Sequence, residues 1–227
     1  MRKLLSLLVI PLIVGSFIVG CASEKEAASV TIGELHPLTG ALAEYGGAEQ
    51  KGGKLAAKHL KEAGYEVKQI FGDTETSAVP GVEAARRLIE VEGAQVLIGA
   101  AGTGQTLSIA ETVSIPSEVP QISYASTSPL ITNLPADEGK DLLFRTCPSD
   151  ALQGVVLGRM AYDKGYKKVS VLYVNNPYGK GLNDVFKETF EELGGTVVAS
   201  VPHDEEPAAS YTAELRKATE GNPDALL

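Results

Sequence analysis

The sequence predicts an α/β protein whose parallel sheets are covered by helices and divided between two lobes. Short apolar segments alternate with amphipathic stretches of about ten to fifteen residues from position 30 onward, which is typical of βαβ units. The alternation is interrupted once, at 124–150, where Pro129, Pro135 and Pro148 occur and no clear helical pattern is present. We therefore expect a first lobe at 30–146 and a second lobe at 147–227.

Hydrophobic periodicity gives the elements of the first lobe. The helix at 47–62 has Leu55 and His59 at helical spacing, and the next helix starts near Pro80, which a first helical turn tolerates, and ends near Gly93. Apolar runs of strand length separate the helices. The predicted strands are 30–35, 65–71, 95–98, 120–123 and 143–145, and the third helix is 105–113.

The second lobe repeats the pattern. A helix at 151–164 has Leu152, Val155, Val156 and Met160 on one side. An amphipathic helix at 182–193 ends at Gly194. Strands are predicted at 169–174 and 196–201, and a last helix at 210–219. Residues 224–227 look like the start of another buried strand. We therefore expect the chain to be an incomplete version of a longer protein, with a truncated second lobe; a natural short form is the alternative.

Composition and charge exclude several classes of protein. The chain has 227 residues, 44% hydrophobic and 22% charged, which is ordinary for a globular protein. Twenty Lys and Arg against 29 Asp and Glu give a net charge of −9, which opposes binding to nucleic-acid phosphates. Two cysteines and three histidines are too few for a disulfide framework or a zinc cluster. We expect no metal and no cofactor.

The N-terminus predicts export and lipidation. Arg2 and Lys3 precede an uncharged run at 4–20, and Ile18-Val19-Gly20-Cys21 resembles the lipobox of prokaryotic lipoproteins. We expect a lipoprotein signal peptide at 1–20, a lipid on Cys21 and a tether at 21–29. The protein would then face the periplasm or the cell exterior, anchored to the membrane; a retained apolar anchor is the alternative.

Motifs of catalysis and nucleotide binding are missing or incomplete. The sequence has no Gly-x-Ser-x-Gly, no His-Glu-x-x-His and no Cys-x-x-Cys. The stretch 47–55 has an extra glycine before Lys54 and Leu55 in place of the hydroxyl residue of a phosphate loop. The glycines of 99–104 lack the dinucleotide spacing. An enzyme is therefore not expected.

Three predicted strand-to-helix turns are rich in glycine and hydroxyl residues: 36–45, 102–106 and 123–129. Such turns meet at the carboxyl edge of a parallel sheet, where ligands bind. Thr103 is a predicted helix cap whose hydroxyl faces either the helix or a ligand carboxylate. Capping alone explains each turn taken singly, so a purely structural role stays open.

Taken in order, these stretches resemble a known family. The matching segments are 37–40, 43–46, 98–107, 122–130, 144–146 and 176–181. They are similar to the extracytoplasmic solute-binding proteins of branched-chain amino acid ABC transporters. The resemblance runs from about Val30 to the end and implies the periplasmic binding protein type I fold, in which two Rossmann-like lobes close on an amino acid.

The resemblance also implies the ligand contacts. Thr103 matches the hydroxyl residue that takes the ligand carboxylate. Ala125 matches the residue whose backbone carbonyl faces the ammonium group, and Thr127 matches a second hydroxyl at the α-carbon groups. Tyr45 and Tyr178 match aromatic positions near the pocket mouth, one in each lobe.

Two positions depart from the family. His36 stands where a glycine or small residue is common, and Thr103 replaces the frequent serine. The implied function is the substrate-binding component of an ABC importer, which binds an aliphatic amino acid or similar small polar solute and delivers it to the permease subunits. The implied partners are that ligand, the permease and, through the lipid, the membrane, with no nucleic acid. The alternative is a sensor module that signals to a membrane receptor.

Overall fold

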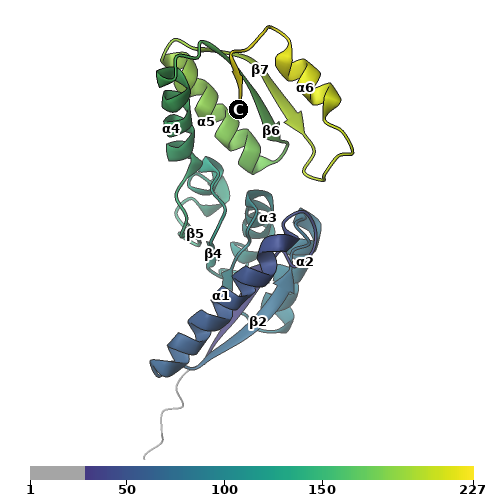
Figure 1. Ribbon diagram of the computed structural model, residues 1–227. Helices are drawn as coiled ribbons and strands as arrows, with labels where there is room; N and C mark the ends of the chain where they lie inside the picture. Colours follow the sequence, from purple (N-terminus) through teal and green to yellow (C-terminus); the bar gives the residue numbers. More distant parts are fainter. Residues whose placement is uncertain (1–28) are drawn as a thin grey trace, which may run out of the picture.

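The computed structural model describes residues 29–227. The predicted signal peptide, Cys21 and most of the predicted tether lie outside the described residues. Figure 1 shows two lobes, the first drawn from purple to teal and the second from green to yellow. The predicted α/β class, with parallel sheets flanked by helices, is confirmed. Within 29–227 no helix has the length and apolarity needed to cross a membrane.

The first lobe contains a five-stranded parallel sheet in the order β2-β1-β3-β4-β5. Its strands are β1 (Val30–His36), β2 (Val67–Asp73), β3 (Val96–Ile98), β4 (Gln121–Ser123) and β5 (Leu143–Arg145). Its helices are α1 (Ala43–Glu62), α2 (Ala78–Arg86) and α3 (Thr103–Ile109), and π-helical turns η1 (Arg87–Val91) and η2 (Ala110–Ser114) extend the last two. Leu35, Leu88, Leu97 and Ile109 are fully buried in its core.

The second lobe contains a three-stranded parallel sheet in the order β7-β6-β8. Its elements are α4 (Asp150–Asp163), β6 (Lys168–Val174), α5 (Pro177–Glu192), β7 (Thr196–His203), α6 (Thr212–Thr219) and β8 (Ala225–Leu226). Phe186 and Phe190 of α5 fill its core. Between β4 and β5 of the first lobe, the segment predicted to lack a helix contains the short 3₁₀ turns η3 (Pro129–Ile131) and η4 (Pro135–Asp137).

Helix α4 does not pack through the apolar side that its sequence pattern indicates. Leu152, Val156 and Met160 are exposed. The helix instead packs on α5 through Gly154 and Gly158, where an added Cβ would lie within 3 Å of α5 side chains. Small residues let the two backbones approach closely, so this face is specified by glycine rather than by apolar bulk.

Two helices begin earlier than their sequence patterns predict. Helix α1 starts at Ala43 rather than 47. Its first turn passes so close to Pro37 that a Cβ at position 46 would lie 2.2 Å from the Pro37 carbonyl oxygen, and Gly46 has no Cβ. Helix α5 starts at Pro177 rather than 182, because the side chain of Asn176 accepts a hydrogen bond from the backbone N–H of Gly179. Glycines that looked like loop residues are therefore helical. Both shifts move residues of the predicted site from loops onto first helical turns.

Candidate ligand-binding site

A cavity of about 510 Å³ lies at the carboxyl ends of the strands, with walls from both lobes. The first lobe contributes the start of α1 and the loops after β3 and β4, and the second contributes α4, the end of β6, the start of α5 and the loop after β7. The lining residues are Ala41, Leu42, Tyr45, Glu49, Ala101, Gly102, Thr103, Ala125, Thr127, Gln153, Val174, Asn176, Tyr178 and Glu205.

All five residues that the sequence predicted for the ligand site line this cavity: Tyr45, Thr103, Ala125, Thr127 and Tyr178. They come from four elements that are far apart in the chain. Both tyrosines are exposed to solvent, with exposed fractions of 54% for Tyr45 and 38% for Tyr178. Their placement on opposite lobes agrees with a position at the rim, while their role in binding stays a prediction.

Thr103 has a buried hydroxyl without a partner. Its exposed fraction is 2%, and its Oγ1 makes no hydrogen bond within the described chain. The predicted capping role is wrong, because Gly102 is the N-cap of α3 and no side chain caps that helix. Since an unpaired buried hydroxyl costs free energy, this atom is available for a ligand acceptor in the cavity.

A buried hydroxyl network holds the loops on either side of Thr103. The hydroxyl of Thr106 lies 2.8 Å from that of Ser126, and it accepts a hydrogen bond from the backbone N–H of Ala100. Ser123 Oγ donates to the carbonyl oxygen of Ala100 at 2.7 Å. Thr106, Ser123 and Ser126 are fully buried. The loops after β3 and β4 are therefore fixed to each other before any ligand enters.

The hydroxyl of Thr127 is oriented by Asp150. Thr127 Oγ1 donates to Asp150 Oδ2 at 2.7 Å, which leaves the oxygen lone pairs of Thr127 free to accept. Burial raises the pKa of the Asp150 carboxyl, and the hydrogen bond from Thr127 and the charge of Arg145 oppose that rise. Burial, together with the charge of Asp150, also raises the pKa of Tyr178, which stays a neutral phenol.

The sequence reasoning missed Glu49, Gln153, Asn176 and Glu205 in the wall. Glu49 lies one helical turn after Tyr45 on α1, so the i, i+4 spacing was the signal that could have found it. It was overlooked because acidic residues on helices usually lie on solvated faces. His36, noted as a departure, does not line the cavity but is buried behind it.

Residues 29–227 contain no cluster of His, Cys, Asp or Glu suited to a metal ion. Cys147 is half-buried, its thiol donates to the carbonyl oxygen of Ser126 at 3.4 Å, and burial raises its pKa. A protonated thiol is a poor nucleophile. Within the described residues, the cavity wall combines apolar side chains with hydroxyl, amide and carboxylate groups.

Comparisons with known proteins agree with this description. The family described as periplasmic binding protein matches residues 29–227. A Leu/Ile/Val-binding protein homolog from Brucella abortus is 31% identical over 199 residues, covering 84% of this chain and 52% of the relative. A chemotactic signal transduction system substrate-binding protein from Halobacterium salinarum is 28% identical, covering 77% of this chain and 43% of the relative. The chain spans about half the length of the curated relatives it matches.

Solved structures match as well. A leucine-binding protein LivK from Thermotoga maritima has a TM-score of 0.76 at 30% identity, with 87% of this chain and 55% of that chain covered. An ABC transporter solute-binding protein from Rhodopseudomonas palustris, in complex with 3,4-dihydroxybenzoic acid, has a TM-score of 0.75 at 24% identity, covering 87% and 53%, and shows the fold alone.

The chain therefore belongs to the periplasmic binding protein family. Its fold and relatives assign it to type I, in the group of the Leu/Ile/Val-binding proteins. The members of this family are solute-binding proteins rather than enzymes, and membership implies an extracytoplasmic location.

Proposed function

We propose that the protein is the substrate-binding component of an ABC importer, that it binds an aliphatic amino acid between its lobes, and that it delivers this ligand to the permease. The observation that carries the proposal is the unpartnered, buried hydroxyl of Thr103 in a cavity whose charged lining residues, among those described, are the two carboxylates Glu49 and Glu205. A free amino acid needs a donor at one end and acceptors at the other.

The polar groups of the cavity wall suit a zwitterion. Thr103 Oγ1 donates to the ligand carboxylate, and a hydrogen bond to a charged group is stronger than one between neutral groups. The carbonyl oxygen of Ala125 and the lone pairs of Thr127 accept from the ammonium group. Ala41, Leu42 and Val174 also line the cavity and offer apolar surface for an aliphatic side chain.

Calorimetric titration of the complete gene product tests this function. The panel contains L-leucine, L-isoleucine, L-valine, benzoate and 3,4-dihydroxybenzoate, because aromatic acids are bound by a structural neighbour. We expect at least one aliphatic amino acid to bind with a micromolar or tighter Kd and the aromatic acids to bind far more weakly. Tighter binding of an aromatic acid would overturn the proposed ligand class.

Lipid anchoring through Cys21 is a further part of the proposal, and it rests on the apolar run and the lipobox-like Ile18–Cys21. A thioether to lipid needs the thiol. We predict that Cys21→Ser releases the protein from the membrane fraction or leaves its signal attached, measured by fractionation and intact mass. Cys147→Ser is the matched control and should leave both unchanged. Normal cleavage with unchanged membrane retention in Cys21→Ser would refute the anchor.

A sensor is the second candidate function, favoured by the similarity to a chemotactic substrate-binding protein. The two functions share the cavity and differ in the partner that recognises the ligand-bound form. Deletion of the gene separates them. Loss of uptake of the labelled ligand supports delivery, whereas intact uptake with loss of chemotaxis toward that ligand supports sensing.

A further inference from the structure

The charged residues that line the cavity are Glu49 and Glu205, and none of its described lining residues is Lys, Arg or His. Glu49 is half-buried on α1. Its Oε2 accepts a hydrogen bond from the hydroxyl of Tyr124 at 3.0 Å. A carboxylate held at a cavity wall without a cation beside it is suited to a positively charged group of a ligand.

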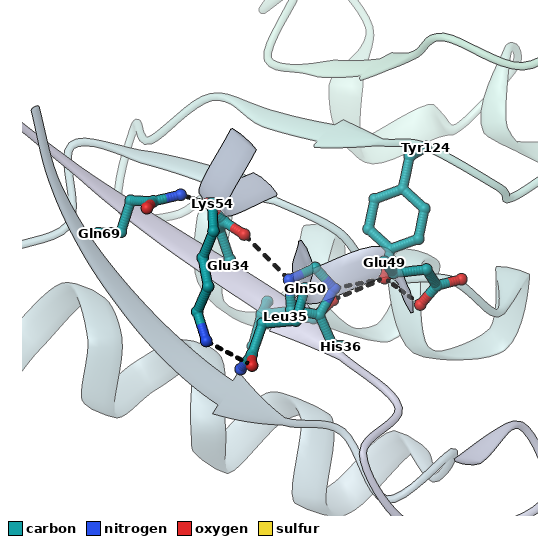
Figure 2. A network of polar contacts seen from close by, with 8 residues as sticks. All are labelled: Glu34, Leu35, His36, Glu49, Gln50, Lys54, Gln69 and Tyr124. Carbon is teal, nitrogen blue, oxygen red and sulfur yellow. Dashed lines mark hydrogen bonds and ion pairs between the residues drawn. The ribbon is translucent and has the colours of Figure 1, made fainter. Parts of the chain in front are cut away.

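A buried chain of side chains stands behind Glu49 (Figure 2). The Nδ1 of His36 lies 3.1 Å from the hydroxyl of Tyr124, and its Nε2 lies 3.0 Å from Glu34 Oε2. The amide of Gln69 donates to the other carboxylate oxygen of Glu34. The exposed fractions are 3% for Glu34 and 2% for His36, so these hydrogen-bonded side chains belong to the interior of the first lobe.

The Tyr124 hydroxyl has one proton to donate, and two of its neighbours accept it: Glu49 Oε2 at 3.0 Å and the carbonyl oxygen of Leu35 at 3.1 Å. The third neighbour, Nδ1 of His36, donates or accepts according to the tautomer of the ring. Burial, with the charge of Glu49 next, raises the pKa of Tyr124 well above its usual range, so the phenol stays a donor.

A glycine of helix α1 makes room for Glu34, which belongs to this buried hydrogen-bonded network. A Cβ on Gly53 would lie 2.0 Å from Glu34 Oε2. The glycine in the stretch that superficially suggested a phosphate loop thus makes room for the Glu34 carboxylate. Gly53 and Glu49 lie on the same helix, so α1 contacts the buried network at Glu34 and also carries the carboxylate that lines the cavity.

We propose that Glu49 binds the ammonium group of the ligand, and that Tyr124 and His36 are positioning residues that hold its carboxylate at the cavity. Tyr124 directly precedes Ala125, so the loop that holds the Glu49 carboxylate also carries the backbone carbonyl proposed as an acceptor. The inference rests on the proposed function, since it requires an amino acid ligand.

The consequence is selection against acids that lack a positive charge. Glu49 and Glu205 repel a monoanion such as benzoate or a hydroxy acid, whereas a zwitterion pairs its ammonium group with the Glu49 carboxylate. Discrimination by unfavourable charge is a common route to specificity. In this reading, Glu49 separates amino acid ligands from the aromatic acids that a neighbour of similar fold binds.

The test is a titration of the complete gene product and its Glu49→Gln variant with L-leucine, L-isoleucine and L-valine, and with the hydroxy acid analogue of each. Gln keeps the size of the side chain and an acceptor for Tyr124. We expect Glu49→Gln to weaken the tightest amino acid about ten- to hundredfold and to leave its hydroxy acid unweakened. Glu62→Gln, an exposed charge on the same helix, is the control and should change neither.

Tyr124→Phe tests the positioning role. We expect a smaller loss with the same selectivity, against the amino acid and not the hydroxy acid, and we expect Glu49→Asp to recover part of the affinity that Glu49→Gln loses. Equal losses for both ligand types would show that these residues only support the fold and would overturn the inference. So would an unchanged affinity of Glu49→Gln for an amino acid that the wild type binds. If the wild type binds none of the amino acids, the proposed function itself fails.

Discussion

The two faces of the cavity are built in different ways. On the first-lobe face, Thr103 is almost fully buried and sits in loops that Ser123, Ser126 and Thr106 cross-link through hydroxyl hydrogen bonds. On the second-lobe face, Gln153 and Tyr178 are exposed, and the side chain of Asn176 is engaged in capping α5. Under the proposed function, the polar recognition groups reside in the hydrogen-bonded loops of the first lobe, and the second lobe supplies covering surface whose position depends on helix packing.

The largest expected effect breaks the first-lobe face. Thr103→Val keeps the shape of the side chain and removes the hydroxyl, so a bound carboxylate loses a charge-assisted hydrogen bond of about 1.5–3 kcal/mol, or about ten- to hundredfold in Kd. Since no described group depends on this hydroxyl, the melting temperature without ligand should be retained. Calorimetry measures the affinity. An unchanged Kd for the cognate amino acid would remove Thr103 from the binding site.

A second prediction disturbs the support of the second-lobe face. In Gly154→Val, the new Cβ would lie 2.7 Å from Val185 Cβ and 3.0 Å from the backbone nitrogen of Phe186, so α4 and α5 must move apart. Overpacking of this kind costs about 1–3 kcal/mol of unfolding free energy, measured by urea denaturation. Gly52→Val, on α1 with nothing near its Cβ position, is the control. Equal stability of the two variants would contradict the close packing of α4 on α5.

A third prediction concerns the loop that leads into α1 on the first-lobe face. Asp73 accepts hydrogen bonds from the backbone N–H groups of Leu38, Thr39 and Glu75 and from the Thr39 hydroxyl. Burial alone would raise the pKa of Asp73, but these hydrogen bonds outweigh it and hold the pKa below its usual value of 3.8. The ionised side chain therefore stabilises the folded state above that value.

Asp73→Ala should lower the unfolding free energy by about 1–2 kcal/mol at neutral pH. Because the folded-state pKa lies below the unfolded one, the difference from wild type should shrink as the pH falls through and below 3.8. Thermal melts across roughly pH 2 to 7 measure this difference. A difference that is constant with pH would show that the charge of Asp73 is not involved. Asp163→Ala, an exposed acid at the end of α4, is the control.

The sequence predicted the strands and helices that have a hydrophobic pattern of their own. Apolar runs located the strands, and the amphipathic stripe of Phe186 and Phe190 located α5. The predicted starts of α1 and α5 were wrong because glycine usually indicates a turn. The sequence does not show that Gly46 and Gly179 instead allow close contacts within helices.

The site divided in the same way. The resemblance led to five residues that line one cavity, but it did not single out Glu49. The pairing of His36 with Tyr124 spans 88 positions and follows no local spacing. Such contacts depend on how strand ends meet at a sheet edge, and only the assembled fold reveals them.

The most direct test of the account is a crystal structure of the complete gene product with the aliphatic amino acid that binds most tightly. We predict that the ligand carboxylate accepts a hydrogen bond from Thr103 Oγ1, while the ammonium group faces the carbonyl oxygen of Ala125, Thr127 and Glu49. A ligand bound outside this cavity, or one whose ammonium group faces Thr103 and whose carboxylate faces Glu49, would contradict it.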